Sequence, residues 1–195
     1  LWERLVFLMG KVRAVCISEK RGTQKKNIES AVFVENWGIE GDAHAGNWHR
    51  QISLLSEETI AAFKARGAEV TDGAFGENLV VSGYDFTKFP IGTRFTCKDV
   101  VLELTQIGKE CHHGCEIFQK MGECIMPTNG VFAKVLHGGK ISVGDEFHVQ
   151  YRAAVITLSD TASKGEREDA SGAAVEEIVG KEGYELSLIH ISEPT

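Results

Sequence analysis

Residues 90–106, PIGTRFTCKDVVLELTQ, contain the pattern that decides the fold, which is a turn followed by two short strands. Pro90-Ile91-Gly92 is a turn sequence, because proline and glycine are the strongest local breakers of regular structure. The segments 94–97 and 100–106 are rich in β-branched and aromatic residues, which favour strands. The stretch therefore predicts a turn and two successive short strands.

Short strands and glycine-containing turns recur along most of the chain before residue 150. Ser56 is a plausible N-cap, since its hydroxyl can accept a hydrogen bond from Thr59, and it predicts a helix that ends at Gly67. Segment 131–136 fits a strand or a short helix. Further strands are predicted at 11–18, 30–34, 51–55, 78–81, 141 and 147–149. Many short strands with frequent glycine turns predict a mainly β, barrel-like domain with a few helices.

The sequence pattern changes at Gln150. Segment 153–158 is a continuous apolar run, like a buried parallel strand, and 170–179 has apolar residues at helical spacing. We expect no parallel partner strand after this helix, although 186–191 could mimic one, so the segment is predicted to be an incomplete α/β unit. The predicted boundaries are a non-native leader at 1–9, the β-barrel domain at 10–150, the truncated segment at 151–186 and a foreign tail at 187–195.

Composition and charge exclude several classes of protein. The net charge of −7 disfavours nucleic-acid binding, because phosphate contacts need clustered Lys and Arg. The one basic cluster, Lys20-Arg21 with Lys25-Lys26, is predicted to be a solvated loop. No apolar run approaches the ~20 residues that span a bilayer, and no targeting segment is recognisable. We therefore expect a cytoplasmic protein with neither a nucleic-acid nor a membrane partner.

Three of the five cysteines fall within fourteen residues, beside two histidines: Cys111, His112, His113, Cys115 and Cys124. A thiolate is both a strong nucleophile and a soft metal ligand. Lys109 and the histidines are close enough in sequence to lower the pKa of a cysteine. The cysteine spacings of four and nine do not match the common zinc pattern. A zinc or iron–sulfur site stays an alternative, as does a structural role for Cys115 and Cys124 as small buried residues.

Two glycine-containing motifs are the other candidates for a site. Residues 41–46, GDAHAG, are followed by His49 and Arg50; glycines let a ligand approach the backbone, while His and Arg bind anions. Residues 75–79, FGENL, predict a turn in which the Asn78 side chain bonds the backbone. Residues 138–146 predict a structural hairpin.

These motifs, in this order, resemble the MOSC domain, which is named for the C-terminal domain of molybdenum cofactor sulfurases. The matching segments are 41–46, 50–55, 75–79, 106–111, 130–136 and 139–145. The resemblance covers about residues 10–149 and implies a β-barrel-rich fold. The family's defining cysteine matches Cys111, five residues after Gln106.

The resemblance implies binding of the molybdenum cofactor, with sulfur transfer or modification of the metal's ligands. In relatives the cysteine is thought to ligate molybdenum or to carry a persulfide, so Cys111 is the expected catalytic residue and molybdenum ligand, with Cys115 and Cys124 as further candidate ligands. The candidate cofactor-binding residues are His44, His49, Arg50, Asn78, Lys109 and His112.

The expected partners are a sulfur donor such as a cysteine desulfurase and a molybdoenzyme acceptor; pyridoxal phosphate binding is a family-level association. Two other functions stay open. One is a non-catalytic carrier of the cofactor, and the other is a structural zinc or iron–sulfur module built on the cysteine-rich segment. Enzyme activity, whether sulfurtransferase-like or dependent on the cofactor, is left open.

Residues 152–186 resemble the start of the molybdopterin adenylyltransferase family. The matching residues include the run 154–160 and Gly183-Tyr184-Glu185. Only about a quarter of such a domain is present, so we expect no adenylyltransferase activity. The association of the two segments suggests that both act on one pathway intermediate.

Overall fold

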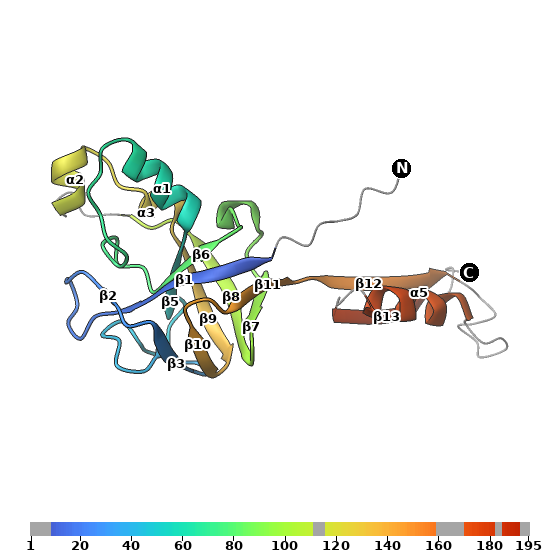
Figure 1. Ribbon diagram of the computed structural model, residues 1–195. Helices are drawn as coiled ribbons and strands as arrows, with labels where there is room; N and C mark the ends of the chain where they lie inside the picture. The colour runs from blue at the N-terminus through green and yellow to red at the C-terminus, as the bar shows by residue number, and fades with distance from the viewer. Residues whose placement is uncertain (1–8, 111–115, 159–169, 182–184, 192–195) are drawn as a thin grey trace. The chain divides into compact units, whose positions relative to one another are not determined.

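The computed structural model describes residues 9–110, 116–158, 170–181 and 185–191 (Figure 1). Backbone contacts divide the chain into two compact units, 1–149 and 150–195. Within the described residues, no helix combines the length and the apolarity needed to cross a bilayer.

Seven strands of the first unit close into a barrel, which confirms the mainly β prediction. They are β1 (Gly10–Ile17), β5 (Ile52–Ser56), β6 (Leu79–Ser82), β7 (Arg94–Cys97), β8 (Val100–Ile107), β9 (Val131–His137) and β11 (Glu146–Gln150). Their order is β1-β6-β5-β9-β8-β7-β11, and β11 pairs back onto β1 through Gly10 and Phe147. The β5–β6 pair is parallel, whereas β1–β6, β5–β9, β8–β9 and β7–β8 are antiparallel. Closure leaves no exposed edge in the ring.

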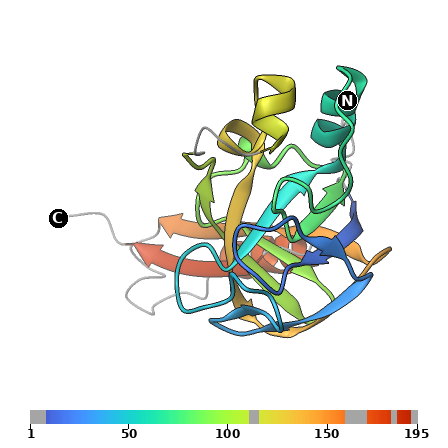
Figure 2. The same cartoon turned by 90° about the vertical axis from the view of Figure 1, so that its left-hand side faces the viewer.

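Smaller elements surround the barrel: β2 (Lys26–Asn27), β3 (Ser30–Val34), β4 (Gly38–Ile39), β10 (Gly139–Ser142), η1 (Phe86–Lys88), α1 (Glu57–Ala65), α2 (Glu116–Met121) and α3 (Met126–Asn129). The Ser56 hydroxyl caps α1 at 3.4 Å from the Thr59 nitrogen, as predicted. Within the segment 138–146, Gly139 begins β10 and pairs with Phe33 in the β10–β3 ladder. Figures 1 and 2 both place α1 and α2 on one side of the barrel.

Side chains on the two faces of the strands build two separate cores. The interior of the barrel holds an aromatic cluster of Phe86, Phe95 and Phe147, fully buried together with the inward aliphatic residues. The opposite face packs against the helices through Leu55, Phe63, Phe75, Ile117, Met126 and Phe132. A bulge between Val12 and Ala14 shifts the alternation of side chains between the two faces of β1. Val12 and Val15 therefore face the barrel interior, and Ala14 faces the helices. The second core borders the cavity described below.

The second unit contains β12 (Arg152–Leu158), α5 (Ala170–Lys181) and β13 (Glu185–Ile191). The strand and the helix were expected, but the prediction that no parallel strand follows is wrong. β13 pairs in parallel with β12 from Arg152–Glu185 to Leu158–Ile191, and α5 packs against both strands. The residues of β13 are mostly apolar or β-branched, which suffices to pair with the free edge of a neighbouring strand.

Candidate functional site

A cavity of about 520 Å³ lies between the loops that carry the glycine motifs and the helical side of the barrel. Four basic side chains, those of Lys25, His44, Arg50 and Lys109, line it together with apolar side chains. None of the described lining residues is Asp or Glu. The lining includes Lys25, His44, Trp48, Arg50, Phe75, Asn78, Lys109, Ile117, Cys124 and Phe132. A volume of this size suits a small molecule, and the lining favours an anionic ligand with an apolar part.

The structure brings most of the candidates from the sequence to this cavity. His44, Arg50, Asn78, Lys109 and Cys124 line it. His49 is not among the lining residues; its ring nitrogen Nε2 lies 3.0 Å from the side-chain oxygen of Gln106. Cys111, His112 and Cys115 lie outside the described residues, although Lys109 and Ile117, on either side of them in the sequence, both line the cavity.

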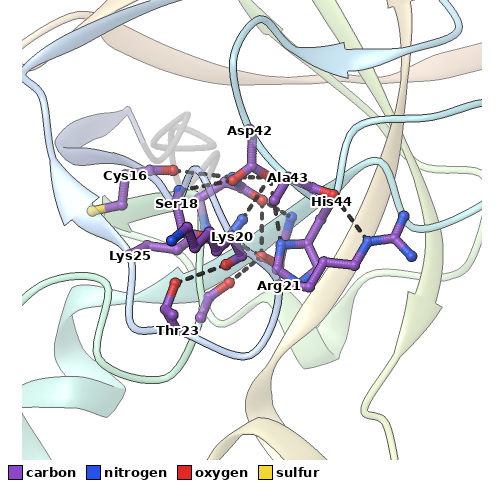
Figure 3. Close-up of polar contacts among 12 residues, drawn as sticks. Cys16, Ser18, Lys20, Arg21, Thr23, Lys25, Asp42, Ala43 and His44 are labelled. Atoms are coloured by element: carbon purple, nitrogen blue, oxygen red, sulfur yellow. Dashed lines mark hydrogen bonds and ion pairs between the residues drawn. The ribbon is translucent and has the colours of Figure 1, made fainter.

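A buried carboxylate, Asp42, organises one wall of the cavity (Figure 3). Its Oδ2 accepts a hydrogen bond from the ammonium of Lys25 at 2.7 Å, and its Oδ1 accepts one from the backbone N–H of Ser18 at 3.0 Å. The side chain of Lys25 is 2% exposed. The prediction that the whole basic cluster is solvated is therefore wrong for Lys25. Asp42 supplies the opposite charge that makes burial of the ammonium tolerable.

The pKa of Asp42 reflects this network. Burial by itself would raise the pKa of the carboxyl, but hydrogen bonds from Lys25 and Ser18 outweigh burial and lower it below its usual value. Burial lowers the pKa of Lys25, and its hydrogen bond to Asp42 opposes that shift. Asp42 is consequently ionised at neutral pH, and its negative charge favours the charged form of Lys25.

Asn78 directly precedes β6 and links it to β1 and β5 at the wall of the cavity, which confirms the prediction that its side chain bonds the backbone. Its amide nitrogen donates to the carbonyl of Cys16 at 3.0 Å and to Asp42 at 3.3 Å. Its amide oxygen accepts from the backbone N–H of Ser53 at 3.1 Å. Both ends of the amide are thus engaged inside the protein, so Asn78 supports the wall and has little capacity left for a ligand.

Glu77 braces the loop beside Lys25, a role that no sequence pattern indicated. Its two carboxylate oxygens accept hydrogen bonds from the backbone N–H groups of Gly73, at 2.6 Å, and Phe75, at 3.0 Å. The Gly73 carbonyl in turn accepts from the N–H of Lys25. Gly73 has a φ of +88°, and a Cβ there would lie 2.2 Å from the Lys25 carbonyl oxygen. Only glycine allows this close approach of the two loops.

Burial raises the pKa of Glu77 to about 7, while its backbone hydrogen bonds act in the opposite direction. In the unfolded chain the carboxyl has a pKa near 4.5. Between about pH 4.5 and pH 7, Glu77 is therefore protonated in the folded protein and ionised in the unfolded chain. Stability from this group is fully present below about pH 4.5 and is lost as the pH rises past 7.

We expect the free energy of unfolding of the parent to fall by about 2–3 kcal/mol more than that of Glu77→Gln between pH 5 and pH 8, since glutamine does not titrate. Urea unfolding at both pH values measures the difference. Glu69→Gln, an exposed residue near the same loop, is the control and should follow the parent. Parallel pH profiles for the parent and Glu77→Gln would contradict the assignment.

His44 and Arg50 both present buried nitrogen atoms without a hydrogen-bond partner in the described part of the chain. Nδ1 of His44 lies 3.9 Å from Oδ2 of Asp42, which is too long for a hydrogen bond. Burial lowers the pKa of His44, as does the charge of Lys25, so the imidazole is neutral at pH 7. Nε of Arg50 is also buried and unpartnered. Buried polar atoms of this kind require a hydrogen-bond partner, which a bound ligand or a water molecule supplies.

The segment that carries Lys109 is anchored just before the undescribed residues. The N–H of Gly108 donates to the Gly130 carbonyl at 2.7 Å, and the Gly108 carbonyl accepts from the Gln106 amide at 2.6 Å. Gly108 has a φ of +70°, and a Cβ there would lie 2.1 Å from the carbonyl oxygen of Pro127. The glycine therefore allows the chain to pass against α3 on its way to Lys109.

The remaining cysteines differ in their surroundings. Burial raises the pKa of Cys16 and of Cys97 to about 12, so both stay protonated and unreactive. Cys124 lines the cavity and packs against the second core. Across the part of the chain that the structure describes, no three His, Cys, Asp or Glu side chains gather closely enough to hold a metal ion.

The class of protein that the described residues define is a closed β-barrel with a cavity on its helical side, lined by cationic and apolar side chains. The MOSC domain family model matches residues 41–148, which is more than half of the chain, and the chain belongs to this family. The family is associated with functions related to the molybdenum cofactor. The resemblance of residues 152–186 to the adenylyltransferase family stays a prediction.

Solved structures show the same fold. The chain resembles the YUAD protein from Bacillus subtilis, with 22% identity and a TM-score of 0.62, over 72% of this chain and 95% of that one. It also resembles YiiM from Geobacillus stearothermophilus, with 18% identity and a TM-score of 0.55, over 91% of this chain and 93% of that one. No curated protein sequence matches the chain significantly.

Proposed function

We propose that this protein binds the molybdenum cofactor in the cavity and that the Cys111 thiolate ligates molybdenum or carries sulfur for transfer. The observation that carries the proposal is the pair of buried, unpartnered nitrogen atoms on His44 and Arg50 in a cavity whose described lining has no carboxylate. Such a lining suits the phosphate and the fused rings of a pterin. When bound, the cofactor supplies a metal with exchangeable ligands.

The chain's own residues then have distinct roles. Arg50 and Lys109 hold the phosphate, because guanidinium and ammonium groups form charge-assisted hydrogen bonds to its oxygens. His44 donates or accepts one further bond at its edge of the cavity. Cys111 follows Lys109 by two residues, and a nearby cation favours the thiolate. Phe75 and Phe132 exclude water from the apolar part of the ligand.

A sulfur-transfer step needs a donor outside this chain. The Cys111 thiolate attacks the outer sulfur of the donor's persulfide, a new S–S bond forms on Cys111, and the donor leaves as its own thiolate. A thiolate of the acceptor then attacks the outer sulfur of the Cys111 persulfide, the acceptor becomes the persulfide, and Cys111 leaves as its thiolate. In this scheme the protein acts in the cytoplasm, where it receives sulfur from a cysteine desulfurase and passes it to a molybdoenzyme.

Replacing Arg50 with methionine tests the cavity. The full chain is produced in cells that make molybdenum cofactor, and molybdenum and pterin are measured per protein. We expect nearly one molybdenum per chain in the parent and at least a tenfold loss in Arg50→Met, because about 1.5–3 kcal/mol of charge-assisted hydrogen bonding is removed. Arg13→Met, which removes an exposed pairing with Glu57, is the control and should keep the metal.

Two results separate the proposal from its alternatives. Mass analysis that finds extra sulfur on Cys111 supports sulfur transfer, whereas release of unchanged cofactor without any sulfur adduct indicates a carrier. Zinc or iron in place of molybdenum would contradict both and indicate the structural metal module.

A further inference from the structure

Trp48 contacts both of the residues that carry unpartnered nitrogens in the cavity. Its indole N–H donates to the backbone carbonyl of His44 at 3.0 Å. Its ring lies under the guanidinium of Arg50, whose central carbon is 4.9 Å from the ring centroid. Phe132, from β9, faces the same guanidinium at 5.6 Å. Arg50 is thereby held against two aromatic rings.

The loop that carries Trp48 is fastened to the barrel independently of any ligand. The hydroxyl of Thr105, on β8, donates to the carbonyl of His49, and the His49 ring meets the Gln106 side chain at 3.0 Å. Trp48 belongs to neither hydrophobic core and lines the cavity while partly exposed. Its ring therefore contributes to the wall of the site and not to the packing of the barrel.

We propose that Trp48 is a positioning residue that fixes Arg50 and His44 for binding a phosphate group; this inference rests on the proposed function. A free arginine side chain samples many rotamers, and stacking on aromatic faces removes most of that freedom before the ligand arrives. The guanidinium then stays fixed in the wall of the cavity, where an oxyanion can meet it. Preorganisation of this kind increases affinity without adding a contact to the ligand.

The arrangement also sets the kind of anion that binds. A stacked guanidinium presents parallel N–H donors in one plane, which match two oxygens of a phosphate. A lysine in the same place would offer a point charge without the fork. The site therefore prefers phosphate over a monatomic anion such as chloride, and it owes this preference to the stacked geometry.

Titration calorimetry of the full chain with inorganic phosphate tests the inference. The variants are Trp48→Leu, Trp48→Phe, Arg50→Met and the double variant Trp48→Leu/Arg50→Met. Trp48→Leu should weaken phosphate binding about tenfold, which corresponds to the loss of one stacked cation, and Trp48→Phe should stay within about threefold of the parent. The loss in the double variant should be smaller than the sum of the two single losses, because Trp48 acts largely through Arg50. Trp37→Leu, at a half-exposed tryptophan of a nearby turn, should bind like the parent.

Thermal unfolding of each variant shows whether it is folded. If Trp48→Leu does not fold, the comparison of Trp48→Phe with the parent still tests the inference. Additive losses in the double variant, or equal losses in Trp48→Phe and Trp48→Leu, would overturn the positioning role. Normal phosphate binding by folded Trp48→Leu would overturn it too and leave the proposed function intact. Absence of phosphate binding in the parent would overturn the anion site and this inference together.

Discussion

Replacing Lys25 with methionine is expected to lower the free energy of unfolding by about 3–5 kcal/mol at pH 7, because it leaves the Asp42 carboxylate buried without its cation. Methionine has nearly the length of lysine, so the change removes charge and hydrogen bonding more than volume. The remaining donors to Asp42, from Ser18 and Asn78, are neutral and replace only part of the lost interaction. Urea unfolding measures the difference.

The double variant Lys25→Met/Asp42→Asn should recover part of this loss, since no uncompensated ion stays buried. The control is Arg66→Met, which breaks the Arg66–Glu123 pair, whose side chains are 52% and 51% exposed. That pair should contribute less than about 1 kcal/mol, because solvent screens it. A loss in Lys25→Met as small as in Arg66→Met would show that the buried pair does not stabilise the cavity wall.

Acid unfolding gives an independent reading of the same pair. The folded-state pKa of Asp42 is lowered, so its contribution to stability is present above the pKa of the unfolded chain and is lost as the pH falls through the folded-state value. Without Lys25 that pKa rises, and the acid unfolding midpoint of Lys25→Met should move to higher pH. Circular dichroism across an acid titration follows the shift.

Local patterns predicted the barrel well because each strand carries its own signal. The strands at 94–97 and 100–106 and the cap at Ser56 depend on residues within a few positions of one another. The Lys25–Asp42 pair depends instead on two loops that meet only after folding. Local composition around Lys25 is basic and polar, so it indicates solvent exposure until Asp42 is placed beside it.

The candidate site shows the same division. The glycine motif and the resemblance led to His44, Arg50 and Lys109, and the structure gathers all three at the cavity. For Asn78 the local pattern predicted a structural hydrogen bond, whereas the resemblance led to a cofactor contact. The hydrogen bonds to the backbone groups of Cys16 and Ser53 agree with the local pattern. The two tryptophans of residues 37–50 contributed to the interpretation of this segment as an ordered functional loop, but no local pattern distinguished Trp48 from Trp37.

Replacing Cys111 with serine is expected to remove the sulfur adduct completely and to lower bound molybdenum at least tenfold. A serine hydroxyl is protonated at neutral pH and is a hard ligand, whereas persulfide formation and molybdenum ligation both need a soft thiolate. Cys16 and Cys97 cannot substitute for it, because burial raises the pKa of each to about 12. Elemental analysis and intact mass of the full chain, produced in cells that make the cofactor, measure both effects.

Cys124→Ser is the matched control, because Cys124 is a cysteine of the described cavity lining. If Cys111 is the reactive residue, Cys124→Ser keeps the molybdenum and the adduct, and the thermal unfolding midpoint of Cys111→Ser equals that of the parent. A structural zinc or iron–sulfur module predicts the opposite pattern, in which loss of either cysteine releases the metal and unfolds the segment. The assignment to Cys111 would be contradicted if Cys111→Ser bound as much molybdenum as the parent while Cys124→Ser lost it. That result would identify Cys124 as the molybdenum ligand.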